Sequence, residues 1–221
     1  SSMIRLLLCL LTFSIGLAFM QLSAQTEVES TPMGGLTYVL PAGTHIIGPC
    51  FVHPDEFSGK IMNIVQNQDI WTISFSGSPF SANEFDEAID APLYYLEIAE
   101  AGVLEGFGFD IISNSTNSLT VQGTEFGNIP QIGDRVLIRK HTTIKEFFNS
   151  VESDLVIGND GVKLLYNGNQ VVTFAWGGGS WFDLSTFQEA NNFPIYPGQA
   201  VSLNNQNSLT LTLEGNVKAT P

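Results

Sequence analysis

Short runs of Val, Ile, Leu, Thr and aromatic residues alternate with clusters of Asn, Gly and Asp along most of the chain, and almost no stretch after residue 24 has a helical period. Such runs are typical of strands joined by tight turns. The clearest is "KLLYNGNQVVTFAW", residues 163–176, where Asn167-Gly168 suits a two-residue hairpin turn. The pattern predicts an all-β protein of repeated antiparallel hairpins, arranged as a β-sandwich or as two small barrel-like halves.

Three further segments share this plan of strand, Asn-bearing turn and Thr-containing strand: "IMNIVQNQDIWTISFSG", "FDIISNSTNSLTVQG" and "AVSLNNQNSLTLTLEG". At a constant offset of 90 positions, Gly43, Glu56 and Phe57 match Gly133, Glu146 and Phe147. One interpretation is a duplication, with similar halves at about 33–130 and 131–221. The other is coincidence among hairpins that obey the same turn chemistry.

Two segments resist the strand pattern and predict one or two short helices. Ser81 and Glu84 have the spacing of a capping box, and so do Thr143 and Glu146. Pro92 would end the first helix soon after it begins.

The N-terminus has the layout of a secretory signal peptide: Arg5, the apolar run 6–20, and a short polar stretch ending in a small residue, Ala24. The apolar run is shorter than the roughly 18 to 20 residues that cross a bilayer. We therefore expect residues 1–24 to be removed and residues 25–221 to form an exported protein without a membrane span, in the periplasm, at the cell surface or outside the cell.

The chain has a formal net charge of −14, and losing Arg5 with the leader leaves seven basic and 22 acidic residues, a net charge of −15. Such a surface repels nucleic acids and anionic headgroups, so neither is an expected partner. Cys50 is the one cysteine after the leader. A disulfide within the mature chain is therefore excluded.

Residues 94–148 carry a family resemblance. "YYLEIAEAGVLEGFGFDIISNSTNSLTV" and "GDRVLIRKHTTIKEFF" resemble an uncharacterised paralogous family of exported β-rich proteins found mainly in Verrucomicrobia. Weaker similarity extends to "LPAGTHIIGPCFV" and "YPGQAVSLNNQNSLTLTLEGNV". This chain departs from the family pattern at Lys140 and Thr142. The resemblance implies export and a repeated β architecture, and it carries no biochemical activity.

Four of the eight basic residues lie within Gly133–Phe148. If 134–141 is a strand, Arg135, Arg139 and His141 share one face. Together with a helix start at Thr143, this face is a candidate site for an anion or for a carboxylate of another subunit. The alternative is a structural corner in which the arginines pair with local carboxylates.

Metal-binding patterns are weak. "CFVHPDE" offers Cys50 and His53 as a single C-x-x-H pair, which is too few ligands for zinc. The acidic run "EFDEAID" offers carboxylates for calcium or for a glycosidase acid pair, but it lacks a calcium-loop pattern, and a solvated face is the alternative. We predict no cofactor, with calcium as the alternative; its candidate ligands are Glu84, Asp86, Glu87 and Asp90.

"WGGGSWF", residues 176–182, is the best candidate for binding a polysaccharide, because glycines remove bulk around Trp176 and Trp181. Indole rings can stack on a pyranose, although a Trp at a strand end is more often a core anchor.

The leading hypothesis is an exported, non-enzymatic structural or surface/matrix protein that associates with itself or with other surface proteins. Its terminal strand, 208–217, would pair with an edge on another subunit. The alternative is a carbohydrate-binding module using Trp176 and Trp181. A secreted hydrolase using Glu84, Asp86 or Glu97 is third, and the sequence contains no recognised catalytic motif.

Overall fold

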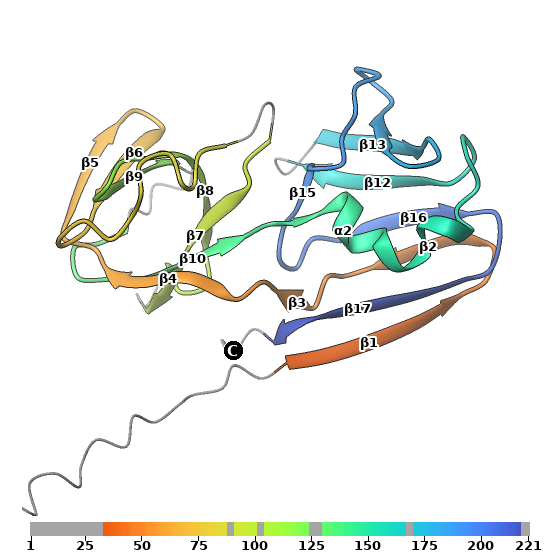
Figure 1. Cartoon of the computed structure of the whole chain (residues 1–221), viewed down its shortest axis with the longest axis horizontal. Coiled ribbons are helices and arrows are strands. Elements are labelled where there is room, and N and C mark those ends of the chain that lie inside the picture. The colour runs from red at the N-terminus through yellow and green to blue at the C-terminus, as the bar shows by residue number, and fades with distance from the viewer. Residues whose placement is uncertain (1–32, 88–90, 101–103, 124–129, 167–169, 218–221) are drawn as a thin grey trace, which may run out of the picture. The chain divides into compact units, whose positions relative to one another are not determined.

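A computed structural model describes residues 33–87, 91–100, 104–123, 130–166 and 170–217 (Figure 1). These residues form 17 strands, one short α-helix and one 3₁₀ segment, and every strand pairing is antiparallel. The prediction of an all-β protein with antiparallel pairing is confirmed. The leader, the Asn167-Gly168 turn and Asp90 lie outside the described residues. No described helix is long and apolar enough to cross a membrane.

The first sheet has seven strands that curve around their own hydrophobic core. Its two end strands follow one another in the chain, separated by Ile61 and Met62. The backbone N–H groups of these residues donate to Asp134 (3.0 Å) and Ser74 (2.9 Å), which joins opposite ends of the sheet. The strand order is β4 (Asp55–Lys60), β10 (Arg135–Lys140), β7 (Tyr94–Glu100), β8 (Gly108–Asn114), β9 (Ser118–Gln122), β6 (Ile70–Ser74) and β5 (Asn63–Asn67).

This core follows from the period-2 pattern of the strands, which sends alternate apolar side chains inward. In β6, Trp71 and Ile73 are buried while their neighbours are partly exposed. Phenylalanine rings from β4 and from the segment after β6 close one side of the core, packing edge to face at centroid distances of 4.9 to 5.5 Å: Phe57, Phe75, Phe80 and Phe85.

The remaining strands form two larger sheets and a small two-stranded one. A five-stranded sheet has the order β14 (Trp181–Asp183), β13 (Gln170–Trp176), β12 (Gly161–Tyr166), β16 (Val201–Asn205) and β2 (Gly43–Ile47). A three-stranded sheet has the order β1 (Met33–Leu40), β17 (Leu209–Val217) and β3 (Phe51–Val52). The short strands β11 (Thr142–Thr143) and β15 (Pro194–Ile195) pair with each other.

A second hydrophobic core lies between these sheets, together with helix α2 (Ile144–Phe148) and the 3₁₀ segment η2 (Asn149–Asp154). Residues 33–52 thus contribute to the same core as residues 144–213. The proposed duplication into halves at 33–130 and 131–221 stays a prediction.

Packing explains why two paired positions of the three-stranded sheet are glycines. Gly34 and Gly215 are register partners on β1 and β17, and Phe51 of β3 lies against both. A Cβ on Gly34 would stand 2.8 Å from the Phe51 ring, and one on Gly215 would stand 2.9 Å from the Phe51 Cβ. Larger side chains at these positions would therefore displace Phe51.

The two predicted helix starts have different outcomes. Thr143 caps α2 in a full capping box with Glu146, as expected. Residues 81–87 form only turns and bends, so the helix predicted there is wrong. The cause is Asn114, whose side-chain oxygen accepts from the Phe85 N–H (2.7 Å) and whose own N–H donates to Asp86 (2.9 Å). These bonds hold the segment against β8.

Candidate interaction surface

The predicted basic corner is a structural joint. Arg139 is buried, and the pairing of its strand with β4 shifts register between Ile138 and Arg139. Its Nε donates to Glu97 on β7 (3.0 Å), and its Nη1 donates to the backbone oxygen of His53 (2.8 Å). Arg135 is exposed and pairs with Glu100 (3.3 Å). Both arginines therefore pair with carboxylates of β7. This arrangement is the structural corner that the sequence offered as the alternative to an anion site.

His141 joins the two cores. It follows β10 and is buried, and its Nε2 lies 3.0 Å from Asp110 Oδ1 on β8. The hydroxyl of Tyr196, after β15, donates to the other oxygen of Asp110 (2.7 Å). The rings of Tyr95 and His141 pack at 4.8 Å between centroids. Burial, together with the charge of Glu97, raises the pKa of the Tyr95 hydroxyl above its usual range. The His141 ring therefore packs between Tyr95 and Tyr196 and hydrogen-bonds to Asp110.

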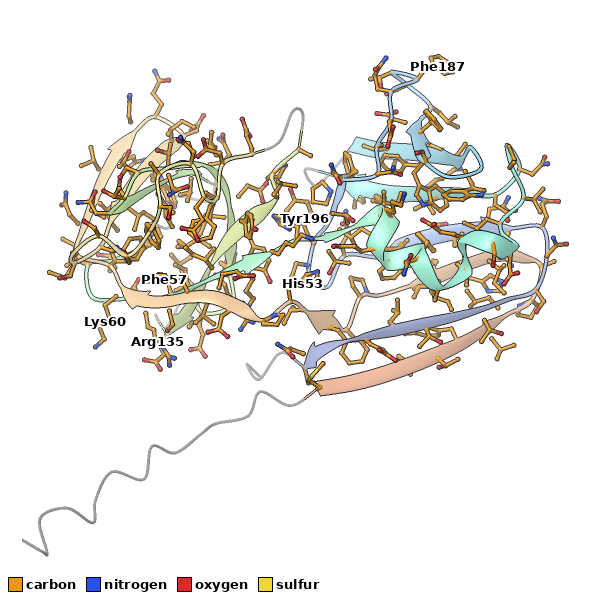
Figure 2. The ribbon with its side chains drawn as sticks, viewed as in Figure 1. His53, Phe57, Lys60, Arg135, Phe187 and Tyr196 are labelled. Atoms are coloured by element: carbon orange, nitrogen blue, oxygen red, sulfur yellow. The ribbon has the colours of Figure 1, made fainter. Side chains whose placement is uncertain are left out.

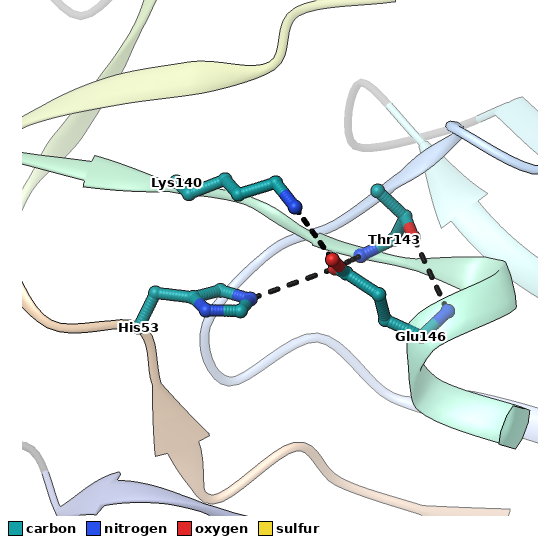
Figure 3. A network of polar contacts seen from close by, with 4 residues as sticks. All are labelled: His53, Lys140, Thr143 and Glu146. Atoms are coloured by element: carbon teal, nitrogen blue, oxygen red, sulfur yellow. Dashed lines mark hydrogen bonds and ion pairs between the residues drawn. The ribbon is translucent and has the colours of Figure 1, made fainter.

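The start of helix α2 is already occupied by the helix's own carboxylate (Figure 3). Glu146 accepts from the Thr143 N–H (3.0 Å), Lys140 Nζ donates to it (2.5 Å), and His53 Nε2 lies 3.5 Å away. Burial alone would raise the pKa of Glu146, but the bonds from His53, Lys140 and Thr143 outweigh it and lower the pKa to about 2. This carboxylate stays ionised at neutral pH, which suits a fixed joint and not proton transfer.

The sugar-stacking prediction for Trp176 and Trp181 is corrected by their burial. Trp176 is 4 % exposed and Trp181 is 0 % exposed, and the two rings pack at 5.3 Å between centroids. An indole needs an open face to stack on a pyranose, and neither ring has one. The exposed aromatic rings of this region are Phe182, at 36 %, and Phe187, at 76 %, which lies at the tip of a projecting loop (Figure 2).

The carboxylates predicted as calcium ligands or catalytic acids bond to different partners. Glu84 accepts from the Ser81 N–H (2.8 Å), Asp86 from the Asn114 N–H (2.9 Å), and Glu97 pairs with Arg139 in the interior. Glu87 lies in the same loop. Among the described residues, no group of three or more His, Cys, Asp or Glu side chains is placed to hold a metal ion.

A groove of about 330 Å³ opens between helix α2 and the end of the three-stranded sheet. Cys50 and His53 border it, along with the apolar side chains of Phe51, Phe147 and Leu213. Cys50 is exposed and unbridged. Met33, the first residue of β1, also lines this groove, so the groove ends at the outer edge of the three-stranded sheet.

That outer edge is the feature that sequence reasoning missed. Strand β1 pairs along its whole length with β17, and no described strand lies on its other side (Figure 1). Large apolar side chains stand exposed along it: Met33 is 77 % exposed, Leu36 is 40 % exposed and Val39 is 72 % exposed. An unpaired edge strand presents a row of free backbone N–H and C=O groups to any incoming strand.

Other sheet edges of the described chain are short or carry polar groups. Edge strand β4 contains Asp55, Glu56 and Lys60, and edge strand β5 contains Asn63, Gln66 and Asn67. Strands β3 and β14 have two and three residues, and edge strand β2 has five, including Thr44 and His45. Strand β1 has eight residues and no charge. The signal was in the sequence, because the 18 residues 33–50 contain no Asp, Glu, Lys or Arg.

The terminal strand, by contrast, is not a free arm. Strand β17 is central in its sheet, between β1 and β3. Where β3 does not reach, Ser150 Oγ accepts from the Thr212 N–H (3.1 Å) and donates to the Thr212 oxygen (3.2 Å). The prediction that residues 208–217 pair with another subunit is therefore corrected. These residues form the central strand of their sheet, and the outer edge of that sheet is β1.

The sequence matches no family model, and comparisons with curated proteins and with solved structures found no significant match.

Proposed function

We propose that this protein is an exported, non-enzymatic structural protein of a surface layer or matrix, which works by association through strand β1. The observation that carries the proposal is the open edge of β1, eight residues long, uncharged and bordered by exposed apolar side chains. The signal-like leader supports export. Soluble proteins that stay monomeric usually blunt such edges with charge, proline or a bulge.

Association through this edge would combine two contributions. An incoming strand would satisfy the outward backbone groups of β1, which gives affinity through a ladder of hydrogen bonds. It would also cover Met33, Leu36 and Val39, and each square ångström of apolar surface removed from water contributes roughly 25 cal/mol. The large acidic charge opposes association elsewhere, so contact is favoured where the chain is uncharged.

The test is the molar mass of the purified protein by light scattering on a sizing column over a range of concentrations. We expect the mass to rise above that of one chain, and Val39→Glu to abolish the rise. The matched control is Val171→Glu, at a position on β13 that is 60 % exposed. Raising the salt concentration should strengthen association of the unmodified protein, because salt screens repulsion between acidic copies.

A mass of one chain at every concentration and salt level would refute the proposal. Equal effects of the two substitutions would refute the assignment to β1, because both add the same charge to an exposed strand position.

A further inference from the structure

The exposed apolar side chains of β1 are spaced symmetrically. Leu36 lies midway between Met33 and Val39 along the strand. In an antiparallel pair of identical strands, a two-fold axis passes between one residue and its own copy. An axis at Leu36 sets Leu36 against its copy and sets Met33 against Val39 of the second copy. Each exposed large apolar side chain then meets another across the contact.

We propose that the partner of β1 is the β1 strand of a second copy, paired antiparallel about a two-fold axis at Leu36. This inference rests on the proposed function and names its partner and symmetry. The result is a continuous six-stranded sheet with the order β3-β17-β1-β1-β17-β3.

This register keeps the two faces of the sheet consistent. Leu36 and Leu40 are four residues apart and therefore share a face of β1. Leu40 is buried in the core, so Leu36 lies on the core side, while Met33 and Val39 lie on the outer side. Directly opposite residues of an antiparallel pair point to the same face. The pairing therefore joins core side to core side, and it covers the part of Leu36 that one copy leaves exposed.

The glycines of β1 suit the same register. The axis at Leu36 places Gly34 opposite Tyr38 of the second copy and Gly35 opposite Thr37 of the second copy. The larger side chains thus face positions without a Cβ, and bulky pairs are confined to the two apolar contacts described above.

The charge distribution favours a second copy over a charged partner. Residues 33–50 offer no carboxylate, ammonium or guanidinium group by which an acidic or basic partner could be recognised. Two acidic chains can approach at this segment without placing like charges opposite each other, which is costly within a sheet. A strand of the same sequence therefore meets the least resistance here.

The register can be measured by thiol cross-linking of the purified mature chain, residues 25–221, carrying Cys50→Ser, which removes the one native thiol of that chain. In this background, Leu36→Cys should cross-link to its own copy with a short bifunctional thiol reagent. Met33→Cys alone should not, because its copy lies about 20 Å away at roughly 3.4 Å per residue. A mixture of Met33→Cys and Val39→Cys proteins should form a mixed cross-linked pair.

Each other outcome has a defined meaning. Self-cross-linking of Met33→Cys, Leu36→Cys and Val39→Cys alike would indicate parallel, in-register strands and would overturn the two-fold register. Association by light scattering without any of these cross-links would also overturn the two-fold register, and the comparison of Val39→Glu with Val171→Glu would then decide whether β1 is still the contact. Monomers in both assays would refute the proposed function itself. Cross-linking of the Val171→Cys control would mark the reaction as nonspecific.

Discussion

The buried ion pair between Glu97 and Arg139 should contribute far more to stability than the exposed pair beside it. Both pairs join β7 to β10, and both contain one glutamate and one arginine. In the inner pair the side chains of Arg139 and Glu97 are 10 % and 2 % exposed, whereas in the outer pair those of Arg135 and Glu100 are 47 % and 69 % exposed. The change is Glu to Gln at each glutamate, which removes the charge and nearly preserves the shape.

The expected magnitudes follow from burial. Glu97→Gln leaves the Arg139 charge in the interior without its counter-ion, and breaking a buried pair on one side costs about 3 to 5 kcal/mol. Glu100→Gln leaves Arg135 in water, and exposed pairs contribute about 0 to 1 kcal/mol. The double variant Glu97→Leu with Arg139→Met removes both buried charges, so it should lose less stability than Glu97→Gln alone.

The assay is urea unfolding followed by tryptophan fluorescence, with the free energy of unfolding taken from the midpoint and slope. It is run at a concentration where each variant has the same oligomeric state, since association adds to apparent stability. Equal losses for Glu97→Gln and Glu100→Gln would refute the reasoning. So would a double variant that is less stable than the Glu97→Gln protein.

Two further predictions concern the core and the helix cap. Trp181→Ala should lower the free energy of unfolding by about 3 to 5 kcal/mol, because the ring is fully buried, whereas Phe187→Ala at an exposed loop tip should change it by less than about 0.5 kcal/mol; urea unfolding of both variants checks this. Glu146→Gln should lower the melting temperature most above about pH 5. The folded pKa of about 2 lies below the ordinary value of 4.5, so the Glu146 contribution is present above the ordinary value and disappears as the pH falls towards 2. A melting-temperature difference that stays constant from pH 7 to pH 2 would contradict this.

Local patterns in the sequence were sufficient where local chemistry decides the structure. The hairpins follow from alternation and turn residues, and the start of α2 follows from the Thr143 and Glu146 spacing, since both capping partners lie within four residues. The same spacing failed at Ser81 because a distant residue, Asn114, takes the Phe85 N–H. A contact across 29 positions leaves no trace in the local pattern.

The burial of aromatic and basic side chains could not be predicted by the same means. Glycines beside Trp176 and Trp181 suggested open rings, but the β13–β14 hairpin turns both rings into the core, where they pack on each other and Trp181 also packs on Phe148. Arg139 was expected on a charged face; it does alternate with Ile138, but Glu97 of β7 and the backbone oxygen of His53 cover its side chain. Strand alternation indicates which residues share a face, and it does not indicate which part of that face other segments cover.

The concentration of positive charge in residues 133–148 follows from the position of this segment between the two hydrophobic cores. Strand β10 belongs to the first core and α2 to the second, and carboxylates from both sides converge on the segment that joins them. Glu97 is buried and would be destabilising there without a cation, which Arg139 supplies, and Lys140 pairs with the partly exposed Glu146. Half of the basic residues in the chain are thus placed in one segment, which leaves the rest of the surface acidic and self-repelling. Against that repulsion, the uncharged edge of β1 would let two copies approach without opposing like charges, which links the internal ion pairs to the proposed mode of association.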